Sequence, residues 1–133
     1  DSRVIPEGIF SAGIGELFVI RVAGNVMDRH QIGSVEYAAD HLGTKLVVVL
    51  GHSNCGAVGA ALHHDPSGYV KYITDEIRKA IGDEKDEAKA CCLNVQRSVS
   101  VIKESLGEMV ERGDLTVCGA VYDIASGKVA FLD

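Results

Sequence analysis

Residues 45–64, KLVVVLGHSNCGAVGAALHH, constrain the fold of this chain more than any other stretch. The first six, residues 45–50, form an almost unbroken apolar run rich in β-branched side chains, which is typical of a strand buried on both faces of a parallel sheet. We expect Gly51 to end this strand, and the small residues from Ala57 onward to form a helix that packs closely on the sheet. The stretch therefore predicts a buried strand that passes directly into a helix.

His52 and Cys55 lie three positions apart at this junction. Open α/β sheets place their sites at the carboxyl ends of the strands, and zinc takes nitrogen and sulfur ligands in a tetrahedral arrangement. The spacing would let the imidazole and the thiolate reach one zinc ion. Either residue alone is more often a core or capping side chain, so the pair needs further ligands to define a site.

Length and composition limit the class of protein. With 133 residues the chain suffices for one hydrophobic core and is too short for two, so we expect a single domain over residues 1–133. Hydrophobic residues make up 47% of the chain, yet no apolar run reaches the length of about 18 residues that a membrane span needs. The 19 acidic and 13 basic residues give a net charge of -6, which argues against nucleic acid as a partner. Four cysteines, two of them adjacent, favour reduced thiols and predict a cytoplasmic location.

Periodicity and turn residues predict the remaining elements. In chain order we expect a strand at 16–22, a helix at 30–42, the strand at 45–50, helices at 69–81 and 86–112, and strands at 115–122 and 128–132. This order predicts an α/β protein with a mostly parallel central sheet flanked by helices.

The longest predicted helix carries a single apolar stripe. Its members step alternately by four and three positions: Ala88, Cys92, Val95, Val99, Ile102, Leu106 and Met109. Cys92 is therefore expected in the core, with Cys91 beside the buried stripe. Because adjacent cysteines on a helix point in different directions, we expect this pair to share neither a metal ion nor a disulfide.

A carboxylate and a guanidinium stand two residues apart at Asp1 and Arg3. An ion pair at this spacing would keep the carboxylate ionised and fixed in direction. A fixed carboxylate is useful beside a metal-bound water. Asp1 and Arg3 therefore join His52 and Cys55 as candidate site residues.

Five segments spread over nearly the whole chain carry a family resemblance: DSRVIPEGIF, ELFVIRVAGN, SVEYAADHLG, VVVLGHSNCGAVGAAL and VCGAVYDIASGKVAFL. In this order they resemble the β-class carbonic anhydrases, most specifically in D-S-R and in G-H-S-N-C-G-A-V. In that family a zinc ion is held by a Cys two positions before the Asp of D-S-R and by the His and Cys of H-x-x-C. The resemblance implies that His52 and Cys55 ligate zinc, that Asp1 and Arg3 form the dyad beside the zinc-bound water, and that the protein is a homodimer or homotetramer.

One ligand of the family pattern falls outside this sequence. The first zinc-ligating Cys would stand two residues before Asp1, at the end of an apolar strand that lies between the strands at 16–22 and 45–50. Without that central strand, two rows of backbone groups would lack partners, at about 1–3 kcal/mol for each buried unsatisfied group. We therefore expect the native protein to be longer at its N-terminus and to contain this strand and its Cys.

The activity implied by the resemblance is reversible hydration of carbon dioxide to bicarbonate and a proton, by attack of zinc-bound hydroxide on CO2. Relatives with the same ligands hydrolyse carbonyl sulfide or carbon disulfide, which makes a sulfur analogue the first alternative substrate. A second alternative is a metal-free protein that keeps the fold for binding or assembly. Assays with carbon dioxide and with the sulfur compound distinguish the first alternative from CO2 hydration. Metal analysis distinguishes the second alternative from a zinc enzyme.

Overall fold

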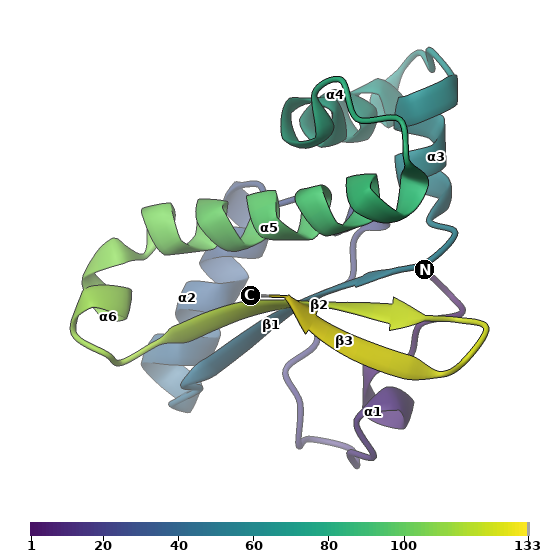
Figure 1. Cartoon of the computed structure of the whole chain (residues 1–133). Coiled ribbons are helices and arrows are strands. Elements are labelled where there is room, and N and C mark those ends of the chain that lie inside the picture. The colour runs from purple at the N-terminus through teal and green to yellow at the C-terminus, as the bar shows by residue number, and fades with distance from the viewer. Residues whose placement is uncertain (133) are drawn as a thin grey trace.

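The computed structural model describes residues 1–132 (Figure 1). Its elements, in chain order, are α1 (Pro6–Ile9), the 3-10 turn η1 (Ala23–Asn25), α2 (Arg29–Leu42), β1 (Leu46–His52), α3 (Gly56–His63), α4 (Tyr69–Ile81), α5 (Glu87–Ser105), α6 (Gly107–Glu111), β2 (Thr116–Asp123) and β3 (Lys128–Leu132). The strands form one sheet in the order β1-β2-β3, in which β1 and β2 are parallel and β2 and β3 are antiparallel. The predicted α/β class is confirmed: helices pack on a sheet that contains a parallel pair, β1 and β2.

Helix α5 runs across one face of the sheet and packs against β1 and β2 (Figure 1). The helix comes very close to the strands because two positions beneath it lack side chains. A Cβ atom on Gly51 would lie 2.5 Å from Cγ2 of Val95, and a Cβ atom on Gly119 would lie 2.7 Å from Cγ1 of the same residue. Val95 is fully buried and belongs to a core cluster with residues of α2, β1 and β2.

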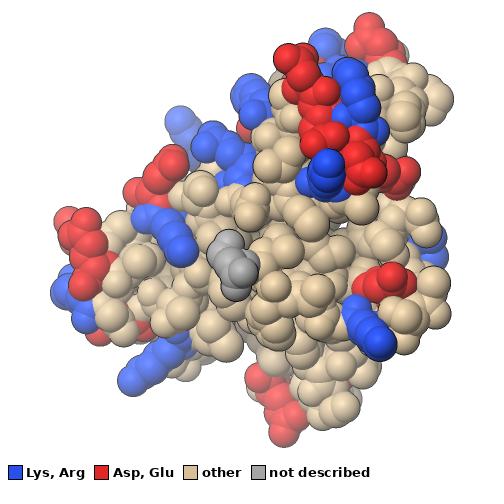
Figure 2. Space-filling model, in the orientation of Figure 1, with Lys and Arg blue, Asp and Glu red and all other residues tan. Residues whose placement is uncertain are grey.

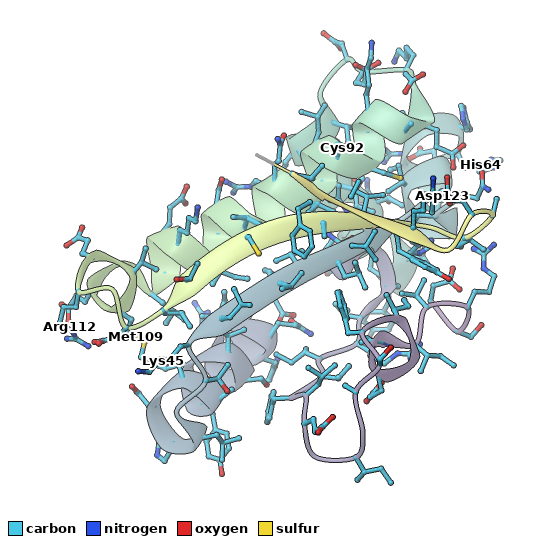
Figure 3. The ribbon with its side chains drawn as sticks, turned by 60° about the horizontal axis from the view of Figure 1, so that its bottom comes forward. Lys45, His64, Cys92, Met109, Arg112 and Asp123 are labelled. Carbon is cyan, nitrogen blue, oxygen red and sulfur yellow. The ribbon has the colours of Figure 1, made fainter. Side chains whose placement is uncertain are left out.

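A second core cluster joins α3, α4 and α5 at the carboxyl end of β1. Its buried members are Cys55, Val58, Ala61, Ile77, Ile81, Ala90 and Cys91. In Figure 3, Asp123 at the end of β2 and His64 after α3 lie at this end of the molecule, whereas Lys45 and Arg112 lie at the opposite end. The loop with His52 and Cys55 therefore leaves the sheet directly beside a packed apolar cluster.

The prediction of a strand at residues 16–22 is wrong for the described chain. Residues 17–22 belong to no helix or strand, and β1 pairs only with β2 among the described residues. An apolar segment becomes a strand only when a neighbouring backbone accepts and donates its hydrogen bonds, and none lies beside this segment. The other edge of β1 is where the resemblance places a further strand, which stays a prediction.

Gly51 does not end the central strand, contrary to our expectation. Strand β1 continues to His52, because Gly51 and His52 stand opposite Val121 and Tyr122 of β2 in the parallel ladder. The start of α2 is also one residue earlier than predicted. Asp28 caps this helix by accepting hydrogen bonds from the amides of His30 and Gln31, so the helix begins at Arg29.

The long helix predicted at 86–112 is divided in two at Leu106. Its buried face is also rotated from the predicted stripe: Ala90, Cys91, Asn94, Val95, Ser98 and Ile102 are buried. Cys91 is therefore in the core and Cys92 is half-buried, the reverse of the prediction. The buried face includes the polar residues Asn94 and Ser98, because both find hydrogen-bond acceptors in the turn at Ala23–Asn25.

Charges of both signs are interspersed over the face shown in Figure 2, most densely around α4. On that face they form no continuous basic surface of the kind that nucleic acid requires. Within residues 1–132, no helix is both long and apolar enough to cross a lipid bilayer.

Candidate metal centre

The junction between β1 and α3 forms a tight turn that is tied to β2. The amide of Ser53 donates to the carbonyl of Tyr122 at 2.9 Å, and Oγ of Ser53 accepts from the amide of Ile124 at 3.0 Å. Asn54 adopts a left-handed conformation with φ of 53°, which reverses the chain before Cys55, the residue that directly precedes α3. These contacts bring His52 and Cys55 to the same turn, both almost fully buried.

His52 presents one ring nitrogen to the protein backbone and the other to Asp1. Its Nδ1 lies 2.9 Å from the carbonyl oxygen of Ser53, which only an N–H group can satisfy as a donor. This assignment leaves Nε2 as the unprotonated nitrogen of the neutral ring. Burial lowers the pKa of His52 below its ordinary value, so the neutral form is favoured. A buried neutral imidazole with its second nitrogen fixed by a carbonyl is the usual state of a metal-ligating histidine.

The carboxylate of Asp1 is held by Arg3 in a two-point ion pair. The distances are 3.0 Å from Nε of Arg3 to Oδ1 and 2.7 Å from Nη2 to Oδ2, and the amide of Arg3 also donates to Oδ1 at 2.8 Å. The same Nη2 donates to the carbonyl of Asn54 at 3.0 Å, which links the pair to the turn between His52 and Cys55. Oδ2 of Asp1 lies 3.4 Å from Nε2 of His52. The structure therefore brings Asp1, Arg3 and the His52–Cys55 turn together.

The donors present fit zinc in kind and leave its coordination incomplete. An imidazole and a buried thiol are the nitrogen and sulfur ligands that zinc prefers. Within residues 1–132, however, no three His, Cys, Asp or Glu side chains are arranged to hold one ion. The roles of His52 and Cys55 as ligands, and of Asp1 and Arg3 as a catalytic pair, stay predictions.

Cys91 lies beside this turn, a feature that the sequence did not indicate. Its thiol donates to the carbonyl oxygen of His52 at a Sγ–O distance of 3.4 Å. Burial raises the pKa of Cys91 to about 12, so the group stays a protonated thiol. Cys91 supports the backbone of His52 from α5 and is not a thiolate nucleophile. Cys91 lies on the same face of α5 as Asn94 and Ser98. The sequence signal for its burial is therefore its helical spacing from these two residues.

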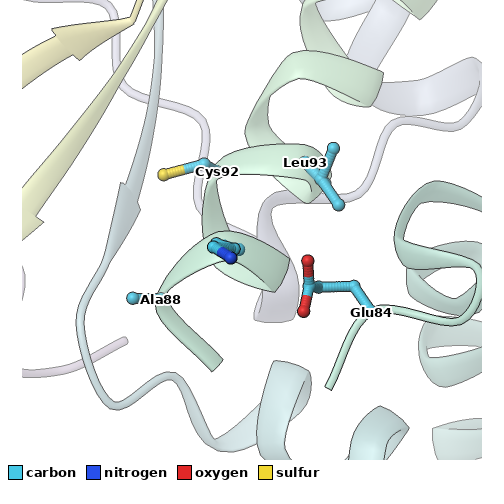
Figure 4. A pocket seen from close by; sticks show the side chains of 5 residues that line it. Glu84, Ala88, Cys92 and Leu93 are labelled. Carbon is cyan, nitrogen blue, oxygen red and sulfur yellow. The ribbon is translucent and has the colours of Figure 1, made fainter. Parts of the chain in front are cut away.

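A hollow of about 370 Å³ lies elsewhere, at the start of α5 (Figure 4). Its lining residues come from the link before α5 and from the first turns of this helix: Glu84, Ala88, Lys89, Cys92 and Leu93. None of the four predicted site residues lines it, so it forms no part of the candidate centre.

His52 predicts a pH dependence of stability for the metal-free protein. Because burial lowers its pKa below 6.5, the unfolded chain binds a proton at this residue in a pH range where the folded chain does not. The free energy of unfolding should therefore fall as the pH drops from about 6.5 towards the folded pKa. Urea titrations at several pH values should show a shallower decline in His52→Gln than in the wild type. His63→Gln, at the exposed end of α3, should decline like the wild type, and equal slopes in all three proteins would contradict the prediction.

The mixed sheet and the His–Cys turn at its carboxyl edge define an α/β protein with a candidate metal centre. Residues 1–129 match the family model described as "Carbonic anhydrase". Among curated relatives, "Carbonic anhydrase 2" of Mycobacterium tuberculosis is 34% identical over 151 residues, spanning 100% of this chain and 70% of the relative. A carbonic anhydrase of Pseudomonas aeruginosa is 37% identical over 155 residues, spanning 100% of this chain and 70% of that relative.

Solved structures give the same result. A β-carbonic anhydrase of Coccomyxa in complex with acetazolamide superposes with a TM-score of 0.87 at 34% identity, covering 99% of this chain and 68% of the other. One of two tetrameric β-carbonic anhydrases from Sordaria macrospora superposes with a TM-score of 0.85 at 30% identity, covering 99% and 76%. The chain belongs to the β-carbonic anhydrase family.

Proposed function

We propose that this protein catalyses the reversible hydration of carbon dioxide to bicarbonate and a proton, with zinc as its cofactor. One observation carries the proposal: the carboxylate of Asp1, fixed by Arg3, lies 3.4 Å from Nε2 of the buried His52. An oriented carboxylate beside a metal-ligating nitrogen is what this reaction needs, because a water molecule must be held and deprotonated there. The names of the relatives agree with this activity.

In this proposal His52, through Nε2, and Cys55, through its thiolate, hold the zinc ion. The third ligand is the Cys that the family pattern places two residues before Asp1. Asp1 lies beside His52 at the carboxyl end of β1, so residues immediately before Asp1 would start from this same end of the strand. That placement supports the ligand set.

The bound zinc would supply a Lewis acid that makes hydroxide available near neutral pH. Oδ2 of Asp1 would accept a hydrogen bond from that hydroxide and so direct the lone pair of the hydroxide oxygen at carbon dioxide. Arg3 orients that carboxylate through two contacts of its guanidinium, and a further contact of the guanidinium, to the carbonyl of Asn54, fixes the pair relative to the turn. The Nδ1 contact of His52 with Ser53 holds the ring in the tautomer that leaves Nε2 free.

The proposal is tested on the protein at its natural length, purified under reducing conditions. Zinc content is measured by mass spectrometry of the metal, and CO2 hydration by stopped flow with a pH indicator, alongside hydrolysis of carbonyl sulfide. We expect about one zinc per chain, and a hydration rate that a chelator abolishes and zinc restores. Turnover of carbonyl sulfide without CO2 hydration would favour the sulfur alternative. A metal-free protein without either activity would favour binding or assembly.

We further propose a homodimer or homotetramer, as in the tetrameric relatives from Sordaria macrospora. Several large apolar side chains are exposed in the first part of the chain: Ile5, Phe10, Ile14, Leu17, Phe18 and Tyr37. Rings of Phe18 and Tyr37 lie 6.4 Å apart and form part of this surface. Exposed apolar surface of this kind marks contact with another chain. Light scattering should give at least twice the monomer mass, and a monomer at micromolar concentration would contradict this expectation.

A further inference from the structure

Asp1 is held at a second point, by a residue that the sequence analysis did not single out. Nη2 of Arg21 donates a hydrogen bond to the main-chain carbonyl of Asp1. The amide of Val4 donates to the same oxygen at 3.1 Å. Arg3 therefore holds the carboxylate of Asp1, whereas Arg21 holds its backbone. A carboxylate keeps its direction only when both its side chain and its backbone are fixed.

Arg21 can act as a support because the turn that follows it is anchored in the core. Nδ2 of Asn94 donates to the carbonyl of Gly24 at 2.7 Å, and Oγ of Ser98 donates to the carbonyl of Asn25 at 2.7 Å. Both side chains lie on the buried face of α5. Gly24 has a φ of 70°, and a Cβ atom there would lie 2.9 Å from Cδ1 of Ile77. The turn therefore has one position relative to α5.

The contacts form a continuous connection from α5 through the turn and Arg21 to Asp1, which faces His52 at 3.4 Å. We infer that Arg21 is a positioning residue for Asp1: it holds the Asp1 backbone so that the carboxylate stays beside Nε2 of His52. The inference rests on the proposed function for its catalytic meaning. Its geometric content, that Arg21 immobilises Asp1, is independent of that function.

The geometric content is tested by amide hydrogen exchange, measured by NMR on Arg21→Gln at natural length. The amides of Arg3 and Val4 both donate to Asp1, so they report directly on its mobility. We expect both to exchange roughly five times faster in Arg21→Gln, as loss of one hydrogen bond predicts, while amides of α5 stay unchanged. The matched control is Arg29→Gln, because Arg29 is exposed at the start of α2 and its side chain forms no hydrogen bond or ion pair within residues 1–132. Unchanged exchange at Arg3 and Val4 would overturn the inference, whether or not the protein is active.

The claim that Arg21 supports catalysis through Asp1 is tested by a double-mutant cycle with Asp1→Asn. We expect Arg21→Gln to lower kcat for CO2 hydration by roughly three- to tenfold, with KM and zinc content unchanged. In the Asp1→Asn background the same substitution should have no further effect, because it acts through the carboxylate that is already absent. A fall in kcat of equal size in both backgrounds would overturn the positioning role. A wild type that hydrates no CO2 would overturn the proposed function instead.

Discussion

Replacing Cys55 by Ser is expected to remove the bound zinc and to lower the rate of CO2 hydration by at least about a thousandfold. Serine keeps the volume of the side chain but replaces a thiolate, a strong zinc ligand, by a hydroxyl group that stays protonated. Cys55 is almost fully buried, so no solvent-exposed donor can take its place without movement of α3. Zinc content and stopped-flow rates, measured on the natural-length protein, test this expectation.

The matched control is Cys92→Ser, which makes the same atomic change on α5. Cys92 is half-buried beside the hollow at the start of this helix and is none of the proposed ligands. The Cys92→Ser variant should keep its bound zinc, and its rate of CO2 hydration should stay within about twofold of that of the wild type. If Cys55→Ser kept a full complement of zinc with an intact fold, as judged by circular dichroism, Cys55 would not be a ligand.

Gly51→Ala is expected to lower the free energy of unfolding by about 3 kcal/mol, although it adds a single methyl group. The new Cβ atom would lie 2.5 Å from Cγ2 of Val95, well inside van der Waals contact. Val95 lies in the middle of α5 and is fully buried, so it has no free space into which it can move. Relief requires that α5 move away from the sheet, which would also disturb the contact between Cys91 and His52.

Thermal and urea unfolding of Gly51→Ala, Val95→Ala and the double variant test this steric explanation. Because Val95→Ala removes the atom that the new methyl group meets, the double variant should be more stable than the sum of the single effects predicts. Gly33→Ala is the control: Gly33 lies within α2 with open space around its Cβ position, so alanine should stabilise the helix by about 0.5–1 kcal/mol. Strict additivity of Gly51→Ala and Val95→Ala would contradict the explanation.

Several helix ends could be predicted because their signals are local. As the sequence predicted, α2 ends at Leu42 and α4 spans Tyr69–Ile81; Gly43 adopts the left-handed conformation directly after α2. Strand β3 has the predicted bounds at Lys128–Leu132. A capping residue or a turn acts through its own backbone and that of close neighbours, so a short window of sequence contains the necessary information.

The predictions that failed depended on distant partners. The apolar segment at 16–22 lacks a neighbouring strand within the described chain, so it forms no part of the sheet. Strand β1 passes through Gly51 because β2, some seventy residues later, continues beside it. The buried face of α5 includes Cys91 rather than Cys92 because Asn94 and Ser98 find acceptors in the turn at Ala23–Asn25.

The sequence by itself determined the residue types of the candidate site and the family, because D-S-R and H-x-x-C are local patterns with specific spacing. Only the tertiary structure decided how these patterns meet: Asp1 beside His52, Arg3 bound to the carbonyl of Asn54, and Arg21 bound to the backbone of Asp1. The physical reason is that each of these contacts joins residues separated by 20 to 51 positions in the sequence. Their distances depend on how α5 and the sheet pack, and that packing is a property of the whole core.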